Sequence, residues 1–242
     1  MGVAFGWGPT EAAVLARDAA CLVVVDVLSF TTSVGVAVES GTAVFPYRWR
    51  DETAVTYAAG LDAALAVGRS EASPRTPWTL SPAALRAAPP TPRLVLPSPN
   101  GSTISAQAGE ATVVAASLRN RTAVARWLAR HGYGSESRPL AVVASGERWP
   151  DGSLRPALED LLGAGGVLSA LRALGSYALT PEARAAATLW EATDDPVAEL
   201  HRCDSGRELY EYGYPQDVAV AAEADTSETV PVLRDGAFQE TP

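Results

Sequence analysis

The stretch CLVVVDVLSFTTS, residues 21–33, places one acid and several hydroxyl side chains at the end of an apolar run. The run reads as a strand that is buried on both faces. A carboxylate at Asp26 is costly there unless it is paired or binds a metal. In the alternative interpretation, the strand ends near Asp26, Ser29 or Thr31 caps the next helix, and the acid faces solvent. The residue types therefore predict either a functional carboxylate or an ordinary helix start.

A second candidate is the segment SPNGST, residues 98–103, which follows another apolar strand. Asn100 and Gly101 come just before a short helix that we expect to begin near Ser102. Glycine permits positive φ, and free backbone N–H groups at a helix start bind anions. The segment therefore predicts a phosphate site, although Asn-Gly also forms ordinary turns.

A third candidate is a helix start in RPALEDLLGAGG, where Glu159 and Asp160 precede the small-residue run 163–166. The helix dipole favours acids in a first turn without any function. Each glycine inside a helix costs roughly 1 kcal/mol relative to alanine, so we expect another element to approach this helix closely. If that element is the strand edge with Asp26, the three acids converge as oxygen ligands for Mg²⁺.

A fourth candidate lies in CDSGRELYEYGYPQDV, residues 203–218, where Arg207 follows a Ser-Gly turn. Its guanidinium can clamp a phosphate or a carboxylate with two hydrogen bonds. An ion pair on the helix surface explains the same pattern equally well.

Several other chemistries are excluded by residue type or spacing. The chain has no lysine, which excludes a Walker-type phosphate loop and Schiff-base catalysis. Leu209 stands where a Cys-x5-Arg phosphatase needs arginine after Cys203, and Leu28 stands where a dehalogenase-type phosphatase needs a second Asp after Asp26. The Arg-His-Gly trio at 130–132 ends a helical run, whereas histidine phosphatases need it at a strand end.

Alternating strands and helices must position these residues. We expect strands near 21–26, 42–47, 93–98, 111–117, 139–145 and 228–236, and helices near 30–40, 51–67, 120–132 and through most of 156–224. This order predicts a largely parallel sheet covered by helices on both faces. Right-handed crossovers then bring the strand carboxyl ends to one edge, where ligands bind. Residues 69–93 form a long loop rich in Pro, Ser and Thr, either a lid or a linker.

The chain length and composition indicate one domain spanning residues 1–242, because 242 residues with 47% hydrophobic content supply one substantial core. A net charge of -9 argues against a nucleic-acid or anionic-membrane partner. No signal-like or membrane-spanning segment is evident, so we expect a cytoplasmic protein. Cys21 and Cys203 are far apart and predict neither a zinc site nor a disulfide framework.

Taken together, the segments VVVDVLSFTTS, SPNGST, SGER with ALEDLLGAGG, SGRELYEYGYPQDV and ADTSETVPVL resemble the 2-phosphosulfolactate phosphatase family in order and spacing. The resemblance covers nearly the whole chain. It implies a three-layer α/β/α fold with a largely parallel or mixed central sheet. It also implies Mg²⁺-dependent hydrolysis of the phosphate ester of 2-phospho-3-sulfolactate, a step toward coenzyme M.

The residue patterns and the resemblance together give the expected roles of individual residues. Asp26 and Arg207 are expected to be catalytic, and the metal ligands are expected to be Asp26, Glu159 and Asp160. The expected substrate contacts are Asn100, Gly101, Ser102, Ser29, Thr31, Arg148, Ser205 and Gly206. The expected partner is a small phosphorylated acid, with a homodimer left open.

The chain departs from the family pattern at three places. The family has arginine where this chain has Ser29 and Thr103, and its Gly-Glu-Arg motif is reduced here to Gly68-Arg69. Each lost guanidinium removes a charge-assisted contact of roughly 1.5–3 kcal/mol. The substrate is then less negatively charged, or an arginine from another position (Arg48, Arg148 or Arg155) substitutes, or the protein has lost catalysis and binds a small anion.

Overall fold

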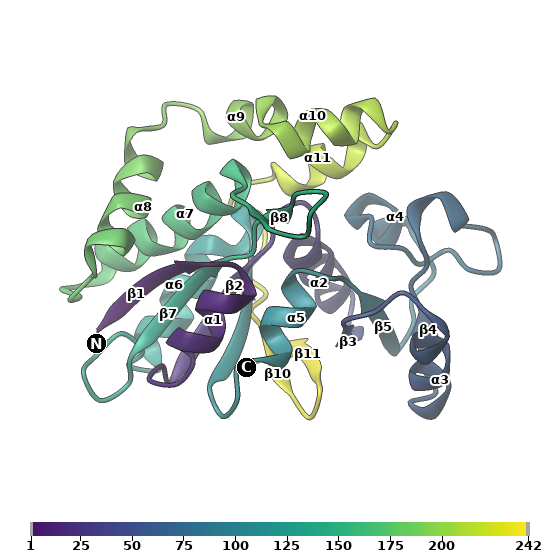
Figure 1. Cartoon of the computed structure of the whole chain (residues 1–242), viewed down its shortest axis with the longest axis horizontal. Helices are drawn as coiled ribbons and strands as arrows, with labels where there is room; N and C mark the ends of the chain where they lie inside the picture. The colour runs from purple at the N-terminus through teal and green to yellow at the C-terminus, as the bar shows by residue number, and fades with distance from the viewer. Residues whose placement is uncertain (1, 241–242) are drawn as a thin grey trace.

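The computed structural model describes residues 2–240 and contains a nine-stranded sheet with helices packed against it (Figure 1). The strand order is β1-β7-β2-β6-β10-β11-β3-β5-β4. These strands are β1 (Val3–Trp7), β2 (Cys21–Val25), β3 (Ala43–Tyr47), β4 (Ala64–Leu65), β5 (Arg93–Pro97), β6 (Thr112–Ala116), β7 (Leu140–Ala144), β10 (Pro231–Arg234) and β11 (Ala237–Glu240). A separate two-stranded ribbon consists of β8 (Glu147–Arg148) and β9 (Leu154–Arg155).

The helices confirm the alternating order expected from the sequence. They are α1 (Gly8–Leu15), α2 (Phe30–Glu39), α3 (Glu52–Gly60), α4 (Pro82–Ala87), α5 (Gly101–Ala106), α6 (Arg121–Arg130), α7 (Leu158–Leu174), α8 (Pro181–Ala192), α9 (Pro196–Arg202), α10 (Asp204–Glu211) and α11 (Pro215–Ala221), with short 3-10 turns at Arg69–Glu71 and Leu118–Asn120. No helix within residues 2–240 is long and apolar enough to cross a membrane.

Both faces of the sheet are buried, as the continuous apolar strands predict. On β2, Cys21, Val23 and Val25 join a core cluster with α6, α7 and α8. The alternate residues Leu22 and Val24 join a second cluster with α1, α2 and α5 on the other face. The expected three-layer arrangement with a largely parallel sheet is therefore confirmed.

The sheet consists of two parallel groups of strands joined by a hairpin. Strands β1, β7, β2 and β6 form one group, and β3, β5 and β4 form the other. The antiparallel β10–β11 hairpin contacts each group through one bridging pair, Val232 with Val114 and Phe238 with Val44. Because three successive pairings between β6 and β3 are antiparallel, the strands of the two groups run in opposite directions. A twist of roughly 20–25° at each strand pair accumulates across the hairpin and turns one group relative to the other.

Four elements differ from the sequence-based expectations. The helix expected over 51–67 is wrong in its second half, because α3 ends at Gly60 and the residues of β4 pair with β5 instead. Strand β1 and helix α1 were not expected. Strand β11 was also missed, because its four residues AFQE carry too short an apolar pattern. The turn before it, Asp235-Gly236, has positive φ at both residues, as in a two-residue hairpin turn.

The segment 69–93 is not entirely loop, since it contains a 3-10 turn and α4. It is attached to α11 through Asp217, which is fully buried. Arg69 Nε donates to Asp217 Oδ2 at 2.8 Å, and the Ser81 hydroxyl donates to Asp217 Oδ1. Ser33 on α2 also donates to the Leu80 carbonyl at 2.9 Å. These contacts fix the segment beside the first residues of α2; its role as a lid stays a prediction.

Candidate functional site

Asp26 is the first residue after β2, and its side chain is buried with 6% exposure. Its Oδ1 accepts the Phe30 N–H at 3.0 Å, and its Oδ2 accepts the Gly101 N–H at 3.1 Å. Ser29 makes no capping hydrogen bond to α2, and the Thr31 hydroxyl donates to the Asp26 carbonyl. The interpretation of Asp26 as a solvent-facing acid beside a side-chain cap is therefore wrong.

The Asn-Gly turn brings the carboxyl end of β5 against the end of β2. A Cβ at Gly101 would lie 2.2 Å from Phe30 Cδ1 and 3.0 Å from Asp26 Oδ2, so only glycine fits without displacement. The Gly101 N–H is already bonded to Asp26 and is not free for an anion. The Ser102 side chain is buried, with its hydroxyl 3.5 Å from the Leu96 carbonyl. In this structure the turn fixes Asp26, and a phosphate contact at Asn100–Ser102 stays a prediction.

Helix α7 brings Glu159 and Asp160 to the same end of the sheet. Asp160 Oδ1 accepts the Val27 N–H at 2.7 Å, and Oδ2 accepts the Gly146 N–H at 2.8 Å. Both acids are buried, with 2% and 3% exposure. The helix can approach this closely because a Cβ at Gly163 would lie 2.8 Å from side chains on the β2 edge. The expected close approach of another element is therefore confirmed: the β2 edge meets Gly163, whereas α8 meets Gly165.

Glu147 is a fourth acid in this region, and the sequence analysis did not select it. It follows β7 at the start of β8 and is partly buried. Its Oε2 accepts the Asn100 side-chain N–H at 3.1 Å. Burial first, and then the charges of Asp26 and Glu159, raise the pKa of Glu147 to about 8. The segment SGER at a strand carboxyl end was the signal that pointed to it.

The pKa values show that these carboxyl groups share one low-dielectric region. Burial, with a smaller contribution from Glu159, raises the pKa of Asp26 to about 6 against the opposing hydrogen bonds from Phe30 and Gly101. Burial, followed by the charges of Asp26 and Glu159, raises the pKa of Asp160 well above its ordinary value. We call Asp26, Glu147, Glu159 and Asp160 the acid cluster. Its negative charges are incompletely compensated by the protein.

Two arginines border the acid cluster, and each is held by an acid outside it. Arg155 donates to both carboxylate oxygens of Glu208 at 2.7 and 3.0 Å, and its charge lowers the pKa of Glu147. Arg69 Nη2 donates to the Ser29 hydroxyl at 2.7 Å, and its charge lowers the pKa of Asp26. These cations offset part of the negative charge at the edges of the acid cluster.

The Ser-Gly-Arg motif lies at the start of α10. Its serine and glycine are buried near the acid cluster, whereas its arginine lies on the surface. Burial, and then the charge of Glu159, raise the pKa of Cys203 to about 12, which places the beginning of α10 near the acid cluster. Ser205 and Gly206 are buried there. Arg207 is largely exposed and pairs with Asp204 at 2.5 Å. The alternative of a surface ion pair thus describes Arg207 in this structure, and its catalytic role stays a prediction.

Arg148 lies on the exposed β8–β9 ribbon, where its Nη1 donates to the Gly152 carbonyl at 3.1 Å. Its contact with a substrate stays a prediction. Thr103 is buried and donates to the Pro99 carbonyl at 2.6 Å, so this hydroxyl is used within the Asn-Gly turn.

The acid cluster offers few oxygens that could bind a magnesium ion directly. Within residues 2–240, no three His, Cys, Asp or Glu side chains have the spacing of a direct metal site. Asp26 and Asp160 each use both oxygens to accept backbone N–H groups, which leaves Glu147 and Glu159 less engaged. The buried Ser145 hydroxyl, at the end of β7, also lacks a hydrogen-bond partner within this range. Because Mg²⁺ commonly takes one or two carboxylates and keeps several waters, these donors fit an ion held partly through water.

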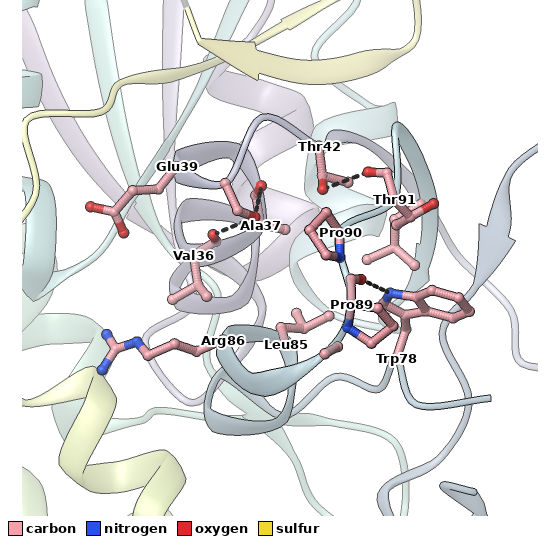
Figure 2. A pocket seen from close by; sticks show the side chains of 13 residues that line it. Val36, Ala37, Glu39, Thr42, Trp78, Leu85, Arg86, Pro89, Pro90 and Thr91 are labelled. Atoms are coloured by element: carbon pink, nitrogen blue, oxygen red, sulfur yellow. Dashed lines mark hydrogen bonds between the residues drawn. The ribbon is translucent and has the colours of Figure 1, made fainter. Parts of the chain in front are cut away.

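A separate cavity of about 250 Å³ lies between α2, α4 and the Pro-rich segment after α4 (Figure 2). Trp78 forms one wall and donates through Nε1 to the Pro89 carbonyl at 3.1 Å. The charged groups in its lining are Glu39 and Arg86, and no member of the acid cluster lines it. The candidate site is therefore the acid cluster rather than this cavity.

Comparisons with known proteins identify similar sequences. A family model described as 2-phosphosulpholactate phosphatase matches residues 10–236. A curated protein of Deinococcus radiodurans, named probable 2-phosphosulfolactate phosphatase, is 34% identical over 146 residues. That match covers 60% of this chain and 57% of the relative, so the chain spans just over half of the relative's length in the alignment. Since the family match includes seven of the nine strands of the sheet and the whole acid cluster, the chain belongs to the 2-phosphosulfolactate phosphatase family.

Proposed function

We propose that the protein is a Mg²⁺-dependent phosphatase that hydrolyses a small phosphate monoester, with 2-phosphosulfolactate as the first substrate to test. The observation that carries the proposal is the convergence of four carboxyl groups at the carboxyl ends of β2 and β7 and the start of α7. Family membership and the printed name of the Deinococcus relative support the choice of ester. A step toward coenzyme M is part of the same proposal.

The charge of the acid cluster explains why a cation is needed. A phosphate monoester is dianionic near neutral pH, and an uncompensated group of carboxylates repels it. Glu159, one of the less engaged acids, would hold Mg²⁺ together with water. The bound ion would neutralise charge on the phosphoryl oxygens and orient the reacting groups.

The two remaining roles concern protons. Asp26, with a pKa near 6, is mainly ionised at pH 7.5 and is held by the N–H groups of Phe30 and Gly101. It accepts the proton of the attacking water, or attacks phosphorus itself. Glu147, with a pKa near 8, is largely protonated at this pH and donates a proton to the leaving oxygen as the P–O ester bond breaks. The water oxygen becomes the fourth oxygen of the released phosphate.

The test is phosphate release from a panel of small monoesters, including 2-phosphosulfolactate and phospholactate, with Mg²⁺ or with EDTA. Wild type is compared with Asp26→Asn and with Asp235→Asn, which neutralises an acid in the β10–β11 turn. We expect release that requires Mg²⁺, falls at least about 100-fold in Asp26→Asn, and is unchanged in Asp235→Asn. Absence of release from every ester would refute the proposal and favour a small-anion-binding protein.

A further inference from the structure

Ser145 carries a buried hydroxyl that no group within residues 2–240 satisfies. The residue follows β7 directly and is 1% exposed, and its Oγ has no hydrogen bond to any described residue. Its backbone is nevertheless fixed, because its N–H donates to the Val25 carbonyl at 2.8 Å. A buried hydroxyl without a partner lowers stability, since folding has removed its hydrogen bonds to water. We therefore expect this hydroxyl to meet a ligand in the functioning protein.

The pairing of β2 with β7 places Ser145 beside Asp26. The last residues of these two strands are a register pair, so the residues that follow them, Asp26 and Ser145, are neighbours. In β7, Val143 faces the layer that contains α5, and alternation along the strand directs Ser145 to the same side. Asp26 also points there, because its Oδ2 accepts the Gly101 N–H at the start of α5.

The residues after Ser145 belong to the acid cluster or are held by it. The Gly146 N–H donates to Asp160 Oδ2 at 2.8 Å, and Glu147 is the next residue. The hydroxyl thus lies next to Asp26 in the sheet and two residues before Glu147 in the chain. Asp26 and Asp160 use both oxygens to accept backbone N–H groups, whereas the oxygen lone pairs of Ser145 are unused.

We propose that the Ser145 hydroxyl is a direct ligand of the Mg²⁺ ion held at the acid cluster. This inference rests on the proposed function, because that proposal supplies the cation. Mg²⁺ takes oxygen ligands, and serine or threonine hydroxyls hold it in other phosphate-processing enzymes. The hydroxyl can bind the cation through its oxygen and still donate its proton to a neighbouring carboxylate. A cation there would also offset part of the negative charge around Ser145.

The binding test titrates Mg²⁺ alone by calorimetry into metal-free wild type, Ser145→Ala and Ser33→Ala. Ser33 is also fully buried, but its hydroxyl already donates to the Leu80 carbonyl at 2.9 Å. We expect Ser145→Ala to weaken Mg²⁺ binding at least about tenfold, and Ser33→Ala to bind Mg²⁺ as wild type does. In EDTA, the Tm of Ser33→Ala should fall because a hydrogen bond is lost, whereas the Tm of Ser145→Ala should equal or exceed that of wild type.

An exchange of the ligand atom tests for direct contact with the cation. Ser145→Cys replaces a hard oxygen by a soft sulfur, and thiolate ligands favour Zn²⁺ over Mg²⁺. We expect this variant to bind Mg²⁺ at least about tenfold more weakly than wild type, and Zn²⁺ at least about tenfold more tightly. Wild type, which contains the same two native cysteines, is the reference for Zn²⁺. Equal Zn²⁺ affinity in the two proteins would count against direct ligation.

The outcomes separate this inference from the proposed function. Weaker Mg²⁺ binding by Ser145→Ala, with an unchanged or higher Tm in EDTA, supports the inference even if no ester is hydrolysed. Equal Mg²⁺ affinity in wild type and Ser145→Ala overturns it even if Mg²⁺-dependent phosphatase activity is found, and so does an equal loss of affinity in Ser33→Ala. If Ser145→Ala weakens only the binding of inorganic phosphate in EDTA, the hydroxyl faces the phosphoryl group and the inference is wrong. No Mg²⁺ binding by wild type at millimolar concentration contradicts both proposals.

Discussion

Glu147→Gln is predicted to remove a large part of the pH dependence of folding stability. In the folded protein the pKa of Glu147 is about 8, compared with 4.5 for an unperturbed glutamate. Between these two values the folded state holds a proton that the unfolded state releases. Stability therefore falls as the pH rises from about 4.5 to about 8, with a slope given by the difference in bound protons. Glutamine mimics the protonated carboxyl and does not titrate.

The magnitude follows from the two pKa values. The Glu147 contribution to the free energy of unfolding decreases by about 3 kcal/mol between pH 5.5 and pH 8.5, at about 1.4 kcal/mol per pKa unit. For a chain of this length, a change of 1 kcal/mol shifts Tm by roughly 2–4 °C. The Tm of wild type should therefore fall by roughly 6–12 °C more than the Tm of Glu147→Gln over this pH range.

The assay is thermal unfolding of both proteins at several pH values between 5.5 and 8.5, in EDTA so that no divalent cation alters the acid cluster. Glu136→Gln, which removes an exposed carboxylate between α6 and β7, serves as the control and should follow wild type. Parallel curves for wild type and Glu147→Gln would refute the reasoning, because they would mean that Glu147 does not sense burial or the charges of its neighbours.

Three further predictions concern packing, pairing and reactivity. Gly163→Ala should destabilise the protein by about 1–3 kcal/mol, because the added methyl group would clash with the β2 edge. In Gly35→Ala the methyl group in α2 meets open space, so the protein should become more stable by up to about 1 kcal/mol. Equal denaturation midpoints for the two variants would contradict this prediction. Arg69→Met leaves the buried Asp217 carboxylate unpaired and should lower the free energy of unfolding by about 3–5 kcal/mol. Arg126→Met removes an exposed ion pair and should lower it by about 1 kcal/mol or less. Similar losses for both variants in urea titrations would count against this prediction. Burial raises the pKa of both cysteine thiols, so a disulfide reagent at pH 8 should label them only after unfolding, and rapid labelling of the native protein would be inconsistent with the structure.

The sequence predicted the parts of the site that depend on local pattern. Asp26 was identifiable because an acid ended a run of buried β-strand residues, and the glycines of α7 indicated that another element packs closely against Glu159 and Asp160. Both signals lie within a few residues of the groups they describe. The structure confirms the close approach and adds the hydrogen bonds that fix the acids.

The missed features depend on contacts between distant segments. Arg69 and Asp217 are 148 residues apart in the chain, and no local pattern shows that they pair. Glu147 was visible in SGER, but its perturbed pKa arises from Asp26 and Glu159, which only the fold brings near it. For Arg207, the sequence could not distinguish a phosphate ligand from a surface ion pair, because both need the same residue type at the start of a helix.

The most direct test of the account is the initial rate of phosphate release from 2-phosphosulfolactate at pH 7.5 across a Mg²⁺ titration, for wild type and Glu159→Gln. The account predicts no release in EDTA, a saturable increase with Mg²⁺ for wild type, and a requirement for at least about tenfold more Mg²⁺ in Glu159→Gln, since one of its few carboxylate donors is lost. A full rate in EDTA, or the same Mg²⁺ dependence in both proteins, would contradict the claim that the acid cluster holds a catalytic cation.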